Sequence, residues 1–166
     1  MRIDGRNGFT QPAVTAAEET IEQMLTKTGV TIVAVHDAHH FSALWPNLGP
    51  WARKGFVGLG MVASGQMSVA AKGTTESVMS TNPIAFATPV AGADLLVFNF
   101  ATSLISHGDL QLMICKDQTA LPGTSIDAQG EETDSPSEIL DVGNILPFSC
   151  HKGALIAMMI DMLVPD

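Results

Sequence analysis

Residues 30–46 read Val-Thr-Ile-Val-Ala-Val-His-Asp-Ala-His-His-Phe-Ser-Ala-Leu-Trp-Pro, and this stretch decides the fold class. Residues 30–35 are nearly all apolar and β-branched, which predicts a strand buried on both faces of a sheet. Three histidines and a serine follow in residues 36–46. Because α/β proteins carry their chemistry after the carboxyl ends of strands, we expect a functional site here.

Helical and strand patterns alternate on both sides of this stretch. Apolar residues at helical spacing over residues 12–25 predict a helix that Gly29 ends. Residues 45–51 predict a short helical segment that stops before Gly55, and residues 56–63 predict a second apolar strand. This alternation is typical of the α/β class.

The second half of the chain is expected to open with a hairpin. Residues 83–88 and 95–98 predict its two strands, and residues 104–114 predict a helix. Residues 119–143 are rich in Gly, Pro, Ser and acidic residues and predict a solvated loop. Residues 153–163 are apolar on nearly every side, which predicts a helix that is fully buried in its native setting. Since almost no chain follows this helix, we expect the chain to be shortened relative to a complete fold.

Composition excludes several classes of protein. With 166 residues, 46% hydrophobic residues and a mean hydropathy of +0.25, the chain can fill the core of one domain. The net charge of −9, without a run of Lys or Arg, argues against nucleic acid and against anionic membranes. No apolar run reaches the ~18 residues of a spanning helix, and residues 1–8 do not form a secretory signal, so we expect a cytoplasmic protein. Cys115 and Cys150 are expected to stay reduced.

Two apparent motifs have simpler explanations. The run Gly58-Leu-Gly60-Met-Val-Ala63 has the letters of a dinucleotide fingerprint, but its glycines lie inside the predicted strand, so we expect them to serve packing. His36, His39 and His40 could bind a metal, yet no acidic partner stands at a helical offset, and we expect no metal site. A capping histidine beside an exposed one remains an equally good reading of the cluster.

A series of motifs along the chain resembles the type-2 malate/L-lactate dehydrogenase family. They occur in the family's order: Asp4-Gly-Arg-Asn-Gly-Phe-Thr-Gln-Pro12, His39-His-Phe41, Thr81-Asn-Pro-Ile-Ala-Phe86, Phe98-Asn-Phe-Ala-Thr-Ser103 and His151-Lys-Gly153. The runs His40-Phe-Ser-Ala-Leu-Trp-Pro46 and His107-Gly-Asp109 are most similar to the branch of Δ1-piperideine-2-carboxylate/Δ1-pyrroline-2-carboxylate reductases.

The resemblance implies a mixed sheet with flanking helices, in the non-Rossmann NAD(P)-binding fold of that family. It further implies that residues 1–166 form one partial oxidoreductase domain, the central cofactor-binding part, and that the protein is a homodimer acting on a small molecule. Family members are longer at both ends and carry a Ser-His-Gly-Arg motif near the N-terminus, which nothing in this chain matches.

The family's functional residues can be carried over position by position. The resemblance places two catalytic residues in the chain, His40 as the proton-transferring histidine and Asp109 as the charge-relay carboxylate. It assigns substrate contacts to Thr81, His107 and Gly108. The cofactor contacts that it implies, to NADPH or NADH, are Phe41, Ser42, Ala43, Leu44, Trp45, Asn99, Phe100, Ala101, His151 and Lys152.

The chain departs from the family pattern at four positions in or beside these predicted sites. Asn99 stands where the family has Asp, which removes a charge and keeps a hydrogen-bond acceptor. Ser80 replaces a Gly, and Ser149 and Cys150 replace a Gly-Gly pair. A side chain at such positions strains the backbone wherever it needs a positive φ or approaches a ligand closely.

The implied reaction is the NAD(P)H-dependent reduction of a cyclic imino acid by hydride transfer. It requires a hydride donor, a proton source and a cation for the substrate carboxylate, for which NAD(P)H, His40 and Lys152 are candidates. Two alternatives stay open. One is an NAD-dependent 2-hydroxyacid dehydrogenase acting on malate, L-lactate or ureidoglycolate, and the other is an inactive fragment that binds nucleotide or a protein through exposed Met-rich surface.

Overall fold

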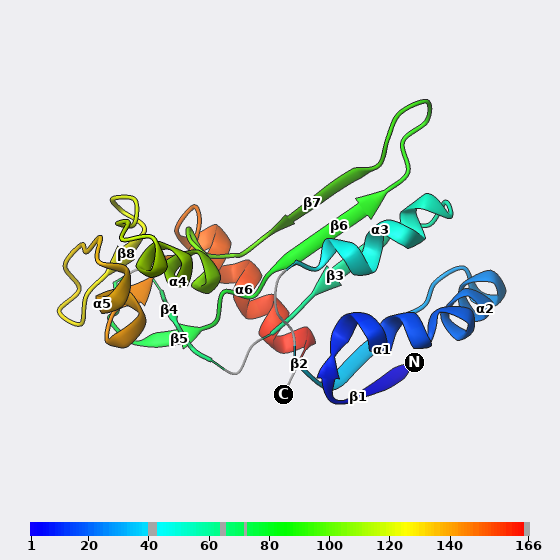
Figure 1. Cartoon of the computed structure of the whole chain (residues 1–166), viewed down its shortest axis with the longest axis horizontal. Coiled ribbons are helices and arrows are strands. Elements are labelled where there is room, and N and C mark those ends of the chain that lie inside the picture. The colour runs from blue at the N-terminus through cyan, green and yellow to red at the C-terminus, as the bar shows by residue number, and fades with distance from the viewer. Residues whose placement is uncertain (40–42, 64–65, 72, 165–166) are drawn as a thin grey trace.

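The computed structural model describes residues 1–39, 43–63, 66–71 and 73–164, which form three small sheets with flanking helices (Figure 1). The first sheet pairs β1 (Arg2–Phe9) with β2 (Ala34–His39). The second has the spatial order β3 (Gly58–Met61), β6 (Ile84–Thr88) and β7 (Leu96–Phe100). The third has the order β5 (Ser77–Met79), β4 (Val69–Ala70), β9 (Asn144–Ile145) and β8 (Ser125–Ile126). The helices are α1 (Thr10–Ala16), α2 (Glu18–Thr28), α3 (Trp45–Arg53), α4 (His107–Cys115), α5 (Pro136–Asp141) and α6 (His151–Leu163).

The sheets combine parallel and antiparallel pairs, as the expected mixed α/β architecture requires. Strands β1 and β2 pair in parallel, and so do β4 and β9. The remaining pairs, including β6 with β7, are antiparallel. The predicted hairpin over residues 83–98 is therefore confirmed, and Figure 1 shows the loop that joins β6 to β7 projecting away from the rest of the molecule.

The predicted strand over residues 30–35 is wrong in its position and its burial. Strand β2 begins only at Ala34, and the side chains of Val30 and Ile32 are 74% and 80% exposed. Two of the histidines that we expected after the strand, His36 and His39, lie within it. A β-branched run predicts an extended backbone, but burial also needs a second layer, and none covers this segment.

Other boundaries also differ from the sequence pattern. The helix expected over residues 12–25 is divided into α1 and α2 at Ala17, although Gly29 ends α2 as predicted, in the left-handed conformation with φ 76°. The helix expected from residue 104 begins at His107. The loop expected over residues 119–143 contains β8 and α5, with Ser125 and Ile139 buried. The sequence did not predict these short elements, because the segment is rich in acidic and small residues, which are typical of loops.

Helix α3 covers one face of the sheet formed by β3, β6 and β7. The side chain of Leu48 lies directly over β3, and a Cβ added at Gly58 or Gly60 would come 3.1 Å or 3.4 Å from its atoms. The two glycines therefore let the helix approach the strand, as we expected when rejecting a dinucleotide fingerprint. Gly55 follows α3 with φ 92° and turns the chain into β3.

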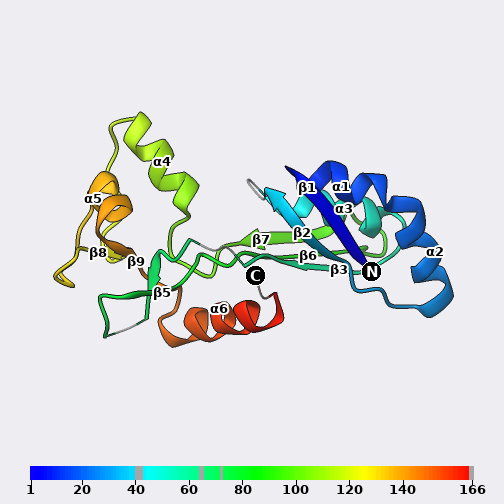
Figure 2. The ribbon, with the colours of Figure 1, turned by 90° about the horizontal axis from the view of Figure 1, so that it is seen from below.

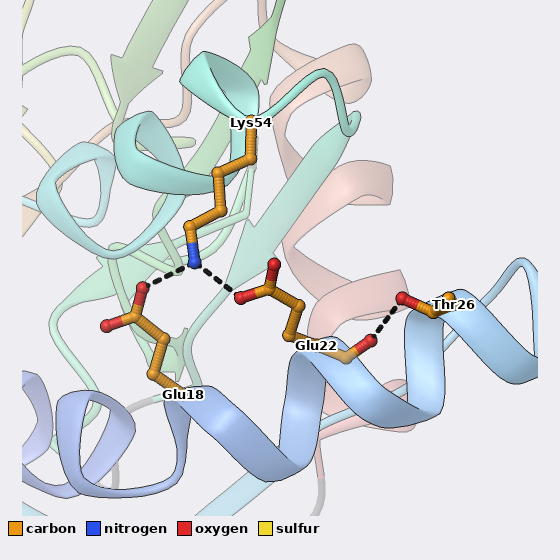
Figure 3. Close-up of polar contacts among 4 residues, drawn as sticks. All are labelled: Glu18, Glu22, Thr26 and Lys54. Atoms are coloured by element: carbon orange, nitrogen blue, oxygen red, sulfur yellow. Dashed lines mark hydrogen bonds and ion pairs between the residues drawn. The ribbon is translucent and has the colours of Figure 1, made fainter.

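An ion-pair network joins α2 to α3. The Lys54 ammonium donates to Glu18 at 2.9 Å and to Glu22 at 2.5 Å (Figure 3). Hydrogen bonds to Glu22 and Glu18 raise the pKa of Lys54 above its usual value. The network's contribution to stability is therefore present at neutral pH and is lost as the pH rises through the pKa of Lys54 in the folded state.

The main apolar core lies between the four-stranded sheet, α4, α5 and α6, and includes Val69, Met79, Leu110, Ile145 and Ala157. Figure 2 shows α6 on the opposite side of the strands from α4. Helix α6 is only partly buried within this chain, since Leu155 and Met162 are 60% and 75% exposed, and its full burial in the native setting stays a prediction. No helix of the described residues combines the length and the apolar character needed to cross a membrane.

Candidate functional site

Two of the predicted cofactor segments meet at the N-terminus of α3. The backbone N–H of Leu44 donates to the side-chain Oδ1 of Asn99 at 2.7 Å, although the residues lie 55 positions apart. Asn99 stands on β7 and Leu44 begins α3, so the contact joins the sheet to the helix that covers it. Trp45, the next residue, is 51% exposed and available to a ligand.

A second set of contacts ties Thr81 to the end of β7. The carbonyl of Thr81 accepts hydrogen bonds from the backbone N–H of Thr102 at 2.8 Å and from its hydroxyl at 3.0 Å. The next residue, Asn82, is fully buried and donates to the carbonyl of Ala157 and to the carboxylate of Asp161 on α6. The predicted substrate residue is thus held between β7 and α6.

The start of α6 lies against the same end of β7. The rings of Phe100 and Phe148 meet edge to face with centroids 5.8 Å apart, and the backbone N–H of Phe148 donates to the carbonyl of Thr102. Gly153 makes this approach possible, because a Cβ there would lie 2.7 Å from the Thr102 carbonyl. His151 and Lys152 are exposed beside it, at the first turn of α6.

The chain reaches this turn through a strained backbone. Ser149 and Cys150, which stand where we expected a Gly-Gly pair, have φ values of 49° and 53°. The predicted conflict between side chain and backbone is therefore confirmed. Such a conformation costs about 1–3 kcal/mol for a residue other than glycine.

The third predicted segment, residues 107–109, starts α4. Ser106 caps this helix by accepting the backbone N–H of Asp109 at 3.0 Å, and its hydroxyl donates to the Asp109 carboxylate at 2.6 Å. Asp109 is exposed and serves the cap in this arrangement. The side-chain amide of Gln66 donates to His107 Nε2 at 3.3 Å.

His107 and Gln66 border a cavity of about 230 Å³. Residues of α5, β5 and β9 complete its wall, and polar side chains dominate there. Ser77 donates to Asn144 Oδ1, while the Asn144 amide donates to the carbonyl of Thr75 at 2.7 Å. Hydrogen bonds therefore hold Ser77 and Asn144 in place in the wall of the cavity that His107 also borders.

The structure thus groups the predicted residues in two places. One group lies around the end of β7 and consists of residues 43–45, Thr81, residues 99–101 and residues 151–152. The other group, residues 107–109, lies at the start of α4. Among the described residues, no hydrogen bond or ion pair joins the side chains of these two groups. Three predicted residues, His40, Phe41 and Ser42, lie outside the described part of the chain.

Several residues in these places escaped the sequence analysis. Phe148 stands within the segment that precedes the His-Lys pair, and its aromatic side chain was the available signal. Asn82 follows Thr81 directly, but only the packing of α6 shows that it is buried. Apart from these two places, Asp4 on β1 and His36 and Asp37 on β2 hold ligand atoms within 4.8 Å of one another, all in exposed side chains. The sequence did not indicate this cluster, because Asp4 comes from the neighbouring strand.

The residues at the end of β7 suit a nicotinamide cofactor. The Phe100 ring, 41% exposed, offers an apolar surface to a base or nicotinamide ring, and Lys152 offers a cation to phosphate groups. Asn99, on the opposite face of β7 from Phe100, and Thr81, whose carbonyl is bound by Thr102, add neutral polar groups at this end of the strand. Apolar surface with a few convergent polar groups is the usual make-up of a cofactor site.

Comparison with known proteins gives this arrangement a family. The sequence model of the family described as malate/L-lactate dehydrogenase matches residues 1–164. The chain belongs to the malate/L-lactate dehydrogenase family. It is 41% identical over 163 residues to a protein of Pseudomonas putida named Δ1-pyrroline-2-carboxylate/Δ1-piperideine-2-carboxylate reductase, covering 98% of this chain and 48% of that one.

Solved structures of malate/L-lactate dehydrogenase-like proteins show the same fold. The Δ1-piperideine-2-carboxylate reductase of Pseudomonas syringae pv. tomato matches with a TM-score of 0.90 and 42% identity, over 98% of this chain and 49% of that one. The sulfolactate dehydrogenase of Methanocaldococcus jannaschii matches with a TM-score of 0.80 and 28% identity, over 98% of this chain and 46% of that one. The chain therefore spans about half the length of the relatives that it matches.

Proposed function

We propose that this chain is the cofactor-binding portion of an NAD(P)H-dependent reductase of cyclic imino acids such as Δ1-piperideine-2-carboxylate or Δ1-pyrroline-2-carboxylate. The observation that carries the proposal is the match to the Pseudomonas syringae reductase, with 42% identity and a TM-score of 0.90 over 98% of the chain. Between relatives this similar, a fold that is shared along the whole match supports a shared ligand class.

In this proposal the end of β7 binds the cofactor. Residues 41–45, residues 99–101 and the pair His151 and Lys152 would hold NADPH or NADH, with the Phe100 ring against an apolar part of the molecule and Lys152 near a phosphate. The cofactor, when bound, supplies the hydride that reduces the C=N bond. The hydrogen bond of 2.7 Å from the Leu44 N–H to Asn99 Oδ1 supports a binding surface to which both segments contribute.

The remaining residues would serve the substrate. Thr81, His107 and Gly108 are proposed to bind it, and His40 to transfer the proton. A histidine suits this role because its unperturbed pKa of about 6.5 lets it hold or release a proton near neutral pH. Asp109 is proposed as the relay carboxylate, which requires that it exchange its bond to Ser106 for one to a histidine when the site assembles.

A second candidate function is an NAD-dependent 2-hydroxyacid dehydrogenase. It is favoured by the match to the sulfolactate dehydrogenase of Methanocaldococcus jannaschii, whose TM-score is 0.80. A third is an inactive fragment that binds nucleotide or a protein, which the half-length match and the exposed side of α6 favour. The proposal also includes a homodimer in the cytoplasm, and the free, exposed Cys115 and Cys150 suit a reducing compartment.

Fluorescence titration of the purified chain with NADPH and then NADH tests the proposal. Δ1-Piperideine-2-carboxylate and afterwards pyruvate are added to the same sample, and cofactor oxidation is followed at each step. We expect saturable nucleotide binding. The variant Lys152→Met, which keeps the length of the side chain and removes its charge, should bind NADPH about tenfold more weakly, whereas Lys116→Met, an exposed lysine after α4, should bind as the parent chain does.

The outcomes separate the candidates. Oxidation of cofactor with the cyclic imine supports the reductase, and oxidation with pyruvate alone supports the dehydrogenase. Binding without turnover by any substrate supports an incomplete site that needs further chain. A chain that melts cooperatively but binds neither nucleotide would contradict both enzymatic readings and leave an interaction module.

A further inference from the structure

Among the described residues, no neighbouring side chain caps the start of helix α3. Leu44 occupies the N-cap position, and its side chain has no oxygen with which to accept a backbone hydrogen bond. The second residue of the helix is Pro46, which has no backbone N–H to donate to a cap. Since a Ser, Thr, Asp or Asn at this position normally stabilises a helix start, this one depends on a partner from elsewhere.

Asn99 supplies that partner across the fold. Its Oδ1 accepts the N–H of Leu44 at 2.7 Å, and the Leu44 side chain is only 5% exposed, so the junction is held by one buried apolar anchor and one short hydrogen bond. The bond to Leu44 shows that the Asn99 amide, on β7, faces the side of the sheet that α3 covers. Residue 99 must supply a hydrogen-bond acceptor here, because the Leu44 N–H can only donate.

We infer that Asn99 is a positioning residue, whose Oδ1 fixes the start of α3 and thereby the exposed Trp45 against the end of β7. One consequence of the inference rests on the proposed function: the cofactor would bind to Ala43, Leu44 and Trp45 in positions that Asn99 has already fixed. Asn99 acts through Leu44, and the acceptor atom is what matters. A carboxylate in its place keeps the bond, whereas an apolar side chain of similar size does not.

The first test needs no ligand. In a Trp51→Phe background, Trp45 is the remaining tryptophan, and acrylamide quenching of its fluorescence reports how firmly the start of α3 is held. Asn99→Leu should raise the quenching constant about twofold, and Asn99→Asp should restore it to near the parent value. Leu96→Ala, on the same strand and 52% exposed in the parent, is the matched control and should change nothing.

The second test is NADPH titration of the same variants. Asn99→Leu should raise the dissociation constant about tenfold, or about 1.4 kcal/mol, and Asn99→Asp should recover most of this loss. A purely structural role would instead lower the melting temperature of Asn99→Leu and Asn99→Asp alike without this rescue. Should Asn99→Leu fail to fold by circular dichroism, Asn99→Ala takes its place in both tests.

Equal quenching of Trp45 in the parent and in Asn99→Leu overturns the inference, and so does an Asn99→Asp variant that behaves like Asn99→Leu. The proposed function fails separately. If the parent chain binds neither NADPH nor NADH, the cofactor assignment falls, while the quenching series still decides whether Asn99 positions the start of α3.

Discussion

Ser149 and Cys150 bring the chain to the first turn of α6 through a conformation that favours glycine. Their φ values are 49° and 53°, and Cys150 combines this φ with a ψ of −114°. Both side chains are exposed, so no burial offsets the strain. The position is held because Gly153 and Phe148 pack against the carbonyl of Thr102 just beyond it.

Replacing Cys150 by glycine should therefore stabilise the chain. We expect Cys150→Gly to raise the free energy of unfolding by about 1 kcal/mol, because relief of the positive φ exceeds the added entropy of the unfolded chain. Urea denaturation measures the change. Gly29→Ala is the converse control: its φ is 76° and nothing lies within 4 Å of its Cβ position, so it should lose stability through the backbone alone. A stability of Cys150→Gly below that of the parent would contradict the strain.

At the level of elements, the buried amide of Asn82 fixes α6 to the segment just before β6. The Asn82 side chain donates to Ala157 at 3.0 Å and to Asp161 at 2.7 Å, while its Oδ1 is buried without a hydrogen-bond partner. Thr81, the neighbouring residue, is bound to Thr102 on the other side. The position of a predicted substrate residue thus depends on a helix far along the chain.

Asn82→Ala should cost about 2–4 kcal/mol of stability, because it leaves two acceptors on α6 without their donor. Asn82→Asp keeps the shape but sets a second carboxylate against Asp161. Two adjacent carboxylates raise the pKa of one of them, so the loss relative to the parent should be larger at pH 7 than at pH 4.5. Thermal denaturation at both pH values measures this. A pH-independent loss for Asn82→Asp would mean that Asp161 does not face residue 82.

At the scale of the whole molecule, apolar side chains remain exposed along α6. Leu155, Met158, Met159 and Met162 are all exposed, and residues 155, 159 and 162 recur at the spacing of one helical face. Contiguous apolar surface of this kind marks an interface. The expectation that this helix is covered in its native setting therefore remains a prediction.

The described chain should associate in solution through this face. We expect the parent to elute as a dimer or larger species, with its apparent mass rising with concentration, and the double variant Leu155→Gln/Met162→Gln to move toward the monomer. Light scattering coupled to size exclusion measures the mass. Leu121→Gln, at an apolar side chain that is 70% exposed and lies outside α6, is the control. A parent chain that stays monomeric at all concentrations would count against the interface.

The fold was predictable where a local pattern has only one structural outcome. The apolar runs on either side of residues 89–94 gave the hairpin, and the missing Cβ of Gly29 gave the end of α2. The segments that were misread depend on distant packing. Val30 and Ile32 have the composition of a buried strand, but no second layer covers them, and Ile139 is buried in an acidic stretch because the four-stranded sheet happens to lie beneath it.

The family and the residue types of the candidate site could be predicted from the ordered motifs between Asp4 and Gly153, because these motifs record side-chain chemistry and need no coordinates. Which of these residues meet depends on the packing of the chain. Leu44 and Asn99 are 55 residues apart, and Asn82, the neighbour of Thr81, binds Asp161, which lies 79 residues further along the chain. Contacts across such separations are set by how helices pack on sheets, and that packing is a property of the whole chain.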